Sequence, residues 1–247
     1  MSCGVKRWRP RPGSDVVKPG GDNGPHVFVD DLEHPELRDE DGHHLTRSLR
    51  LRPGDTFTAS DGAGSWRVCR LGSGPRGDAE ADGELVYVEA PHPKLTIGFA
   101  LIKGGRPELV VQKLTELGVD AIVPFTAEHS VVRWDADRGV RHVERLRRVA
   151  REAAMQSRQV RIPEIGEVAE FADLAAGPGA VRADITGNPT SLDHPTVLIG
   201  PEGGWSEAER HQLGAIRISS SVLRSETAAI GAAALLTALR DEVISAG

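Results

Sequence analysis

The sequence has few cysteines and no long apolar run, and each shortage excludes a class of protein. Its two cysteines, Cys3 and Cys69, exclude a disulfide framework and a multi-cysteine zinc site. No stretch reaches the roughly 18 apolar residues that a membrane span needs, and no N-terminal segment has the apolar core of a signal peptide. These absences predict a cytoplasmic protein with no membrane partner and no metal.

Aromatic residues are also scarce, at 4% of 247 residues. This argues against the Phe- and Tyr-rich stacking platforms of many single-strand RNA binders. The net charge of −6 argues against nucleic-acid binding when it is summed over the chain, but binding depends on local patches. Arginines are concentrated in one segment, at positions 138, 141, 145, 147, 148, 151, 158 and 161. Because guanidinium groups bind phosphate bidentately, this segment predicts a nucleic-acid partner, the alternative being a solvated helix face.

The chain is predicted to have two domains behind a disordered extension. Residues 1–25 are rich in Gly, Pro and Arg and lack a hydrophobic period, so we expect disorder; the alternative is a basic RNA-tracking arm. Residues 26–90 hold short strand patterns and Gly turns, with one helical insert over 42–50, which favours a small β-barrel. The strand patterns cover residues 26–29, 55–59, 65–69 and 84–88.

After the stiff break at residues 90–93, strands alternate with helices, which predicts a mainly parallel α/β sheet over residues 94–247. The expected strands cover residues 95–101, 121–125, 196–199 and 215–218. The expected helices cover residues 107–117, 138–158 and 227–239, and one more begins after Ser206, which forms a capping box with Glu209.

Two C-terminal segments carry the strongest chemical signals. The first runs from Leu198 to Ser206, where an apolar strand leads into the loop Gly200-Pro201-Glu202-Gly203-Gly204. Its glycines let backbone approach a ligand closely, although the loop matches neither GxGxxG nor the Walker pattern. The second is Val222 to Ala229, where Arg224 and Glu226 lie at the start of a helix. The alternatives are an ordinary βα turn and an ordinary helix cap.

Two further segments place basic residues near loops. Lys103 and Arg106 flank a Gly pair at the end of a strand, and Arg47 and Arg50 lie three residues apart in the helical insert. The pair His43-His44 raises the question of a metal, but the other ligands of a zinc site are missing from the surrounding sequence.

Taken together, these segments resemble the RsmE family, SPOUT-class methyltransferases that modify N3 of a uridine in small-subunit (16S) ribosomal RNA. Five motifs occur in the family's order. They are His44-Leu-x-Arg-x-Leu-Arg, the Gln112-Lys-x-x-Glu-Leu-Gly helix end, Ala153-Ala-Met-Gln-Ser-Arg, Gly200-Pro-Glu-Gly-Gly and Leu223-Arg-x-Glu-Thr.

The resemblance implies a PUA-like β-barrel followed by a trefoil-knotted α/β domain. It also implies S-adenosylmethionine (SAM) as cofactor, 16S ribosomal RNA within the small subunit as partner, and a homodimer. The cofactor-binding residues would be Leu198, Ile199, Gly200, Pro201, Glu202, Gly203, Gly204, Ile218, Ser219, Ser220, Val222 and Leu223. The catalytic residues would be Arg224, Glu226 and Glu202, and the RNA-binding residues Arg47, Arg50, Lys103, Arg106 and Arg158.

The chain departs from the family pattern at three positions. Ser219 and Ser221 stand where the family usually has Gly and Arg, and Met155 stands where it usually has Glu. A left-handed backbone at Ser219 would cost energy, because serine carries a Cβ. These departures keep open a non-catalytic RNA-binding or ribosome-assembly module with the same fold. A dehydrogenase is disfavoured by the missing GxGxxG.

Overall fold

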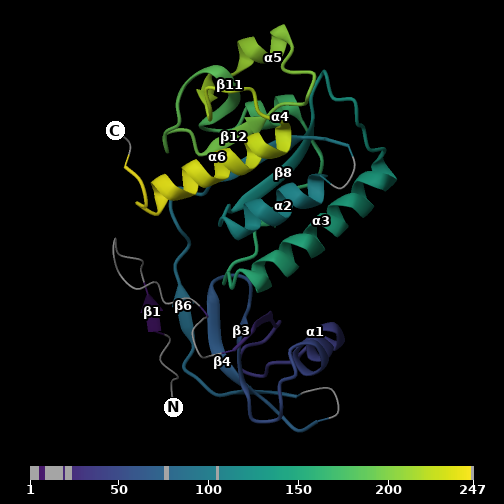
Figure 1. The fold of residues 1–247 in the computed structure, drawn as a ribbon, viewed down its shortest axis with the longest axis vertical. Helices are drawn as coiled ribbons and strands as arrows, with labels where there is room; N and C mark the ends of the chain where they lie inside the picture. The colour runs from purple at the N-terminus through teal and green to yellow at the C-terminus, as the bar shows by residue number, and fades with distance from the viewer. Residues whose placement is uncertain (1–5, 9–18, 20–23, 75–77, 104–105, 246–247) are drawn as a thin grey trace. The chain divides into compact units, whose positions relative to one another are not determined.

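The computed structural model describes residues 6–8, 19, 24–74, 78–103 and 106–245, and Figure 1 shows it as a ribbon. The chain divides into two compact units. One consists of residues 1–90 together with 154–162, and the other of residues 91–153 together with 163–247. Each unit is organised around a sheet of its own.

The N-terminal unit contains a mixed sheet in the order β1-β6-β4-β3-β2, with β5 paired to β4. Pairs β1–β6 and β2–β3 are parallel, and the remaining pairs are antiparallel. Its described elements are β1 (Lys6–Trp8), β2 (His26–Phe28), α1 (Asp39–His43), the π-helix η2 (His44–Ser48), β3 (Thr56–Ser60), β4 (Ser65–Leu71), β5 (Ala79–Ala81) and β6 (Val86–Val88).

Apolar residues from these strands and from the helical insert form the core of the N-terminal unit. Val27, Leu45, Phe57 and Cys69 are fully buried there. The predicted strands and helical insert are confirmed, the insert as α1 followed directly by η2. Strand β5 was not predicted, because its sequence Ala-Glu-Ala lacks the β-branched and aromatic residues that favour strands.

Most of the expected disordered extension, residues 1–25, lies outside the described residues, including Arg9 and Arg11 of the alternative basic arm. Lys6–Trp8 are described, and they form β1 in parallel register with Val86–Val88. For these three residues the expectation of disorder is wrong. The edge of β6 offers unpaired backbone groups, which an extended segment of any composition is able to pair with.

A segment distant in sequence completes the N-terminal unit. The Ser60 hydroxyl donates to the carbonyl of Val160 at 3.0 Å, and Met155 packs against the core. Arg161 donates to the carbonyls of Ala63 and Val88. Residues 154–162 therefore belong with the sheet of this unit, although the first three of them end the helix Ala136–Gln156, which the sequence places among the α/β elements.

The second unit contains a parallel sheet in the order β10-β8-β7-β12-β11-β13, with β9 paired to β8. Its helices are α2 (Arg106–Glu116), α3 (Ala136–Gln156), α4 (Phe171–Ala175), α5 (Glu207–Gln212) and α6 (Ser225–Arg240). Its strands are β7 (Thr96–Ala100), β8 (Ala121–Thr126), β9 (Glu164–Ile165), β10 (Ala169–Glu170), β11 (Ala180–Pro189), β12 (Thr196–Ile199) and β13 (Ala215–Arg217).

The parallel sheet confirms the predicted α/β architecture. Strands β7 and β12 are neighbours and almost fully buried, which explains their continuous apolar sequences. Helices α2 and α6 contact each other and lie side by side in front of the strands in Figure 1. Because the strands run parallel, the loops after β7, β8 and β12 all leave from the same edge of the sheet.

Strand β11 was not predicted, because its last six residues include Asp184, Gly187, Asn188 and Pro189, which are residue types rare in strands. Ala183 and Asn188 both pair with Ile216, so the strand shifts register as it passes β13. A Cβ on Gly187 would lie 2.4 Å from the Ile216 carbonyl carbon, so only glycine fits this close approach. The trefoil knot that the resemblance implies stays a prediction.

One buried titratable group in the N-terminal unit couples folding to pH. His26 is 4% exposed, and its Nδ1 lies 2.9 Å from the Thr58 hydroxyl. Burial lowers the pKa of His26 from 6.5 to about 4, and the nearby charge of Arg158 acts in the same direction. Below pH 6.5 the unfolded chain therefore binds a proton that the folded chain excludes.

We predict that acid weakens this unit through His26. Lowering the pH from 7.5 to 5 should cost about 2 kcal/mol of unfolding free energy through this group, and the change should be much smaller in His26→Gln. Urea unfolding of both proteins at the two pH values measures it. An equal loss of stability in both proteins would assign the acid sensitivity to other groups.

Candidate active site

The loop after β12, residues 200–204, packs tightly against its surroundings through its glycines. A Cβ on Gly200 would lie 2.8 Å from the Trp205 ring, and one on Gly203 would lie 3.0 Å from the His129 Cβ. Gly204 has a φ of +73°, a left-handed conformation that favours glycine. The predicted need for glycine in this loop therefore has a physical basis in the structure.

The predicted capping box anchors the end of this loop. The Ser206 hydroxyl accepts from the backbone N–H of Glu209, and the Glu209 carboxylate accepts from the backbone N–H of Ser206. The second oxygen of Glu209 accepts from the N–H of Glu128 at 2.9 Å. Glu209 thus ties the loop after β12 to the loop after β8, where His129 Nδ1 lies 3.2 Å from the Gly204 carbonyl.

The second predicted loop, residues 218–223, follows β13 and leads into α6. The N–H of Ser221 donates to the Ser219 hydroxyl at 3.1 Å, and Val222 is 84% exposed. Among the described non-glycine residues, positive φ occurs only at Arg50, Arg158 and Glu242. Ser219 is therefore not in the left-handed conformation that would strain it.

One hydrogen bond joins the loop after β12 to the start of α6, which follows the second loop. The Ser225 hydroxyl, at the start of α6, donates to the carbonyl oxygen of Gly200 at 2.8 Å. Ser225 is buried and Gly200 is half-buried, so the bond is partly shielded from water. It holds together two segments more than twenty positions apart, and the single ligand site expected there stays a prediction.

Three charged side chains lie together beside this junction. Arg106 donates to Glu202 at 3.2 Å, and its Nε lies 3.8 Å from Glu226 Oε1. Glu226 is largely buried, and its Oε2 has no hydrogen-bond partner among the residues that the structure describes. An unpaired buried carboxylate oxygen is costly, so it marks a place where a ligand N–H or O–H would bind.

Arg224 occupies the N-cap position of α6, with an extended backbone and no capping hydrogen bond from its side chain. It is exposed, and none of its described neighbours forms an ion pair with it. Its guanidinium is therefore available to a ligand next to the loop junction. Arg106, expected to contact RNA, instead contacts the two carboxylates expected to be catalytic.

The residues expected to bind RNA are divided between the units. Lys103 and Arg106 belong to the α/β unit, whereas Arg47, Arg50 and Arg158 belong to the N-terminal unit. Arg50 and Arg158 have φ of 60° and 55°, which is strained for arginine and typical of functional positions.

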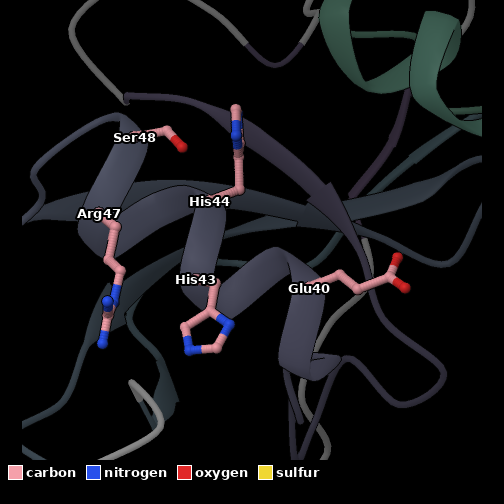
Figure 2. Close-up of a pocket in the computed structure, with 5 residues that line it drawn as sticks. All are labelled: Glu40, His43, His44, Arg47 and Ser48. Carbon is pink, nitrogen blue, oxygen red and sulfur yellow. The ribbon is translucent and has the colours of Figure 1, made fainter.

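Arg47 lines a shallow hollow on α1 and η2, of about 490 Å³. In Figure 2, Arg47 and His43 point to the same side, and His44 points away from them. The hollow is completed by Glu40 and Ser48. Arg47 and His43, which point to the same side, are suited to a phosphate group, with the negative charge of Glu40 opposing it.

Several arginines of the basic segment have partners in the protein. Arg145 pairs with Glu108 at 3.0 Å, and Arg147 pairs with Glu167 at 2.7 Å. Arg141 and Arg148 are exposed on α3. Some guanidinium groups of the segment thus form ion pairs and others face solvent, and its contact with nucleic acid stays a prediction.

No group of three or more His, Cys, Asp or Glu residues suited to a metal ion occurs in the described part of the chain. Burial raises the pKa of the Cys69 thiol to about 11, so it is protonated at neutral pH and a poor nucleophile. No helix within the described ranges is long and apolar enough to cross a membrane.

Sequence reasoning missed the residues that hold the loops together. The sequence patterns assign no contact to Ser225 or His129, and they give Glu209 only as half of a capping box. The Ser206–Glu209 capping pattern is the sequence signal that could have indicated the contact with the loop after β8. A capping box uses one oxygen of Glu209, and the second oxygen of this buried carboxylate needs another partner.

Comparison with known proteins agrees with this geometry. Residues 89–237 match the model of the RNA methyltransferase domain family, and residues 37–82 match the RNA methyltransferase PUA domain. The chain is 30% identical over 226 residues to Ribosomal RNA small subunit methyltransferase E of Mycobacterium bovis, covering 82% of this chain and 86% of that protein.

Two solved structures are similar over most of their length. Ribosomal RNA small subunit methyltransferase E from Neisseria gonorrhoeae, bound to S-adenosyl methionine, has 27% identity and a TM-score of 0.74, covering 87% of this chain and 97% of that chain. A putative methyltransferase from Legionella pneumophila, in complex with SAM, has 25% identity and a TM-score of 0.74, covering 86% and 96%. By sequence and fold, the chain belongs to the RsmE family of RNA methyltransferases.

Proposed function

We propose that this protein transfers a methyl group from SAM to N3 of a uridine in small-subunit (16S) ribosomal RNA. Family membership supports the reaction class, and the solved relatives with SAM support the cofactor. The observation that carries the proposal is the bond from Ser225 to Gly200, which brings the start of α6, directly after the second predicted cofactor loop, against the first. Glu226 and the exposed Arg224 flank that junction.

The residues present fit SAM. Backbone of Gly200–Gly204 and of Ile218–Leu223 would hold the cofactor, and exposed Val222 offers it an apolar contact. When bound, SAM supplies an electrophilic methyl group on a sulfonium sulfur. The glycine loop keeps side chains away from the ligand, and the contacts through Glu209 and Ser225 fix its shape before binding.

The protein's own residues would prepare the uridine. N3 of uracil carries a proton at neutral pH, so this proton must leave before N3 attacks a methyl group. We assign Glu226 Oε2 as the proton acceptor, because it is buried and unpartnered, whereas Glu202 is about half exposed. Arg224 would stabilise the negative charge that develops on a uracil carbonyl oxygen. Arg106 would hold both carboxylates in place.

We further propose a cytoplasmic homodimer that acts within the small ribosomal subunit. A ribosomal RNA substrate supports the location, and the exposure of Arg224 and Val222 supports a site that a second subunit completes. The alternative of a non-catalytic module rested on Ser219 and Ser221. Ser219 adopts no left-handed backbone, which removes the argument from strain, while Ser221 still stands where the family usually has Arg.

The function is tested in two steps. Mass spectrometry of 16S ribosomal RNA from cells lacking this gene should find one uridine without its methyl group. Calorimetric titration of the purified protein with SAM should give a saturable heat. A complete methylation pattern would contradict the proposed substrate, and the absence of heat would favour the binding module.

Arg224→Ala should lower kcat about 100-fold, since removal of one preorganised donor to a developing negative charge costs about 3 kcal/mol. SAM affinity should stay within about twofold, because loop backbone binds the cofactor. Arg217→Ala, an exposed arginine on β13, serves as the matched control. Full turnover by Arg224→Ala with SAM bound would remove this role.

Glu226→Gln should slow the single-turnover rate between 10²- and 10⁴-fold, the usual range for loss of a general base. Glu202→Gln should slow it less than tenfold, because that carboxylate is half exposed and contacts only Arg106 among the described residues. Rapid-quench methyl transfer at saturating SAM compares the two. A larger loss of rate in Glu202→Gln than in Glu226→Gln would assign Glu202 as the proton acceptor.

A further inference from the structure

A second hollow is found in the α/β unit. The residues that line it include none from the loops 200–204 and 218–223. It has a volume of about 210 Å³ and lies between the start of α2, the loop after β8, and α3. Ile102 and Leu146 supply apolar walls, and both are buried. Pockets for drug-sized ligands measure ~300–1,000 Å³, so this one suits a single ring system.

Two stacked rings line the hollow. The centroids of Trp134 and His142 lie 4.2 Å apart with an interplanar angle of 16°. Trp66 and Trp205 are buried, but Trp134 is only partly so. A partly exposed tryptophan, stiffened by a stacked ring, offers a flat apolar surface to another ring.

The hollow also contains an unsatisfied hydrogen-bond acceptor. Glu108 Oε1 pairs with Arg145 Nε at 3.0 Å, while Oε2 is buried without a partner among the described residues. The exposed Lys103 lies at the border. An occupant that presents an N–H to Glu108 would give this carboxylate the partner it lacks, which favours a nucleobase edge over a purely apolar ligand.

The turn of α2 separates this hollow from the candidate catalytic carboxylates Glu202 and Glu226. Arg106 contacts Glu202 and Glu226. Glu108 follows two residues later, which is about 200° further around a helix, and it faces α3 through Arg145. The hollow and the candidate active site therefore lie on different sides of the first turn of α2. A base in the hollow would then be a neighbour of the base that is methylated, and not that base itself.

We propose that this hollow binds an RNA base adjacent to the methylated uridine. The base stacks beside the Trp134–His142 pair and donates an N–H to Glu108 Oε2, while Lys103 and exposed Arg141 of α3 contact the flanking phosphates. This inference rests on the proposed function, and it adds a site that selects the sequence around the target.

The test compares Trp134→Leu and Trp134→Phe with wild type on small ribosomal subunits from cells lacking this gene. Trp134→Leu should raise KM for the subunit about 5- to 150-fold, the range for loss of one base stack, with kcat within about twofold. Trp134→Phe should stay within about threefold. Val131→Ala, at a 70% exposed neighbour, is the matched control.

SAM affinity and the unfolding midpoint of each variant separate binding from a structural role. If Trp134 only supported the fold, then kcat, SAM affinity and the midpoint would all change in Trp134→Leu. An unchanged KM in that variant overturns the base site and leaves the methyltransferase function intact.

Fluorescence gives a readout that needs no methyl transfer. A mixed-sequence hexaribonucleotide should quench wild-type tryptophan emission saturably, and Trp134→Phe should lose that quenching. Glu108→Gln should keep the quenching with weaker affinity. Saturable quenching that depends on Trp134, in a protein without methyl transfer, would support the base site and contradict the proposed function. Equal quenching in wild type and Trp134→Phe, or none in either, overturns the base site.

Discussion

The hydrogen bond from the Ser225 hydroxyl to the Gly200 carbonyl is the contact on which the candidate site depends. It joins the loop after β12 to the N-terminus of α6, so the glycine loop, Arg224 and Glu226 share one location. A buried bond of this kind contributes about 1 kcal/mol, which is small for folding but sufficient to choose between loop positions. The neighbouring contacts through Glu209 and Gly200–Trp205 act in the same direction.

One carboxylate oxygen beside this junction lacks a hydrogen-bond partner. Arg106 contacts Glu202 and Glu226, while Asp184 is neutralised in a separate network by Arg182 and Arg210. Glu226 Oε2 alone among these carboxylate oxygens is buried without a partner in the described part of the chain. An N–H or O–H of a ligand bound beside the junction would satisfy this oxygen.

Periodicity and turn signals predicted the parallel sheet and most of its helices, because buried parallel strands are continuously apolar and capped helices have characteristic starts. They did not predict β11, whose polar second half adopts its path only because β13 lies beside it. In the candidate site, the glycines of loop 200–204 and the Ser206–Glu209 capping box could be predicted from the sequence. The pairing of Arg106 with Glu202, and of Glu108 with Arg145, depends on tertiary contacts that local patterns do not contain.

The return of residues 154–162 to the N-terminal unit has a consequence for how the protein is divided. A fragment that ends at Ala90 would lack the Val160 carbonyl that holds Ser60, and the Arg161 guanidinium that binds Val88. It would also expose the core surface that Met155 covers. An N-terminal unit cut out as one continuous stretch therefore has hydrogen-bond donors without acceptors and an exposed apolar surface. Proteolysis between residues 90 and 91 should release no stably folded N-terminal fragment.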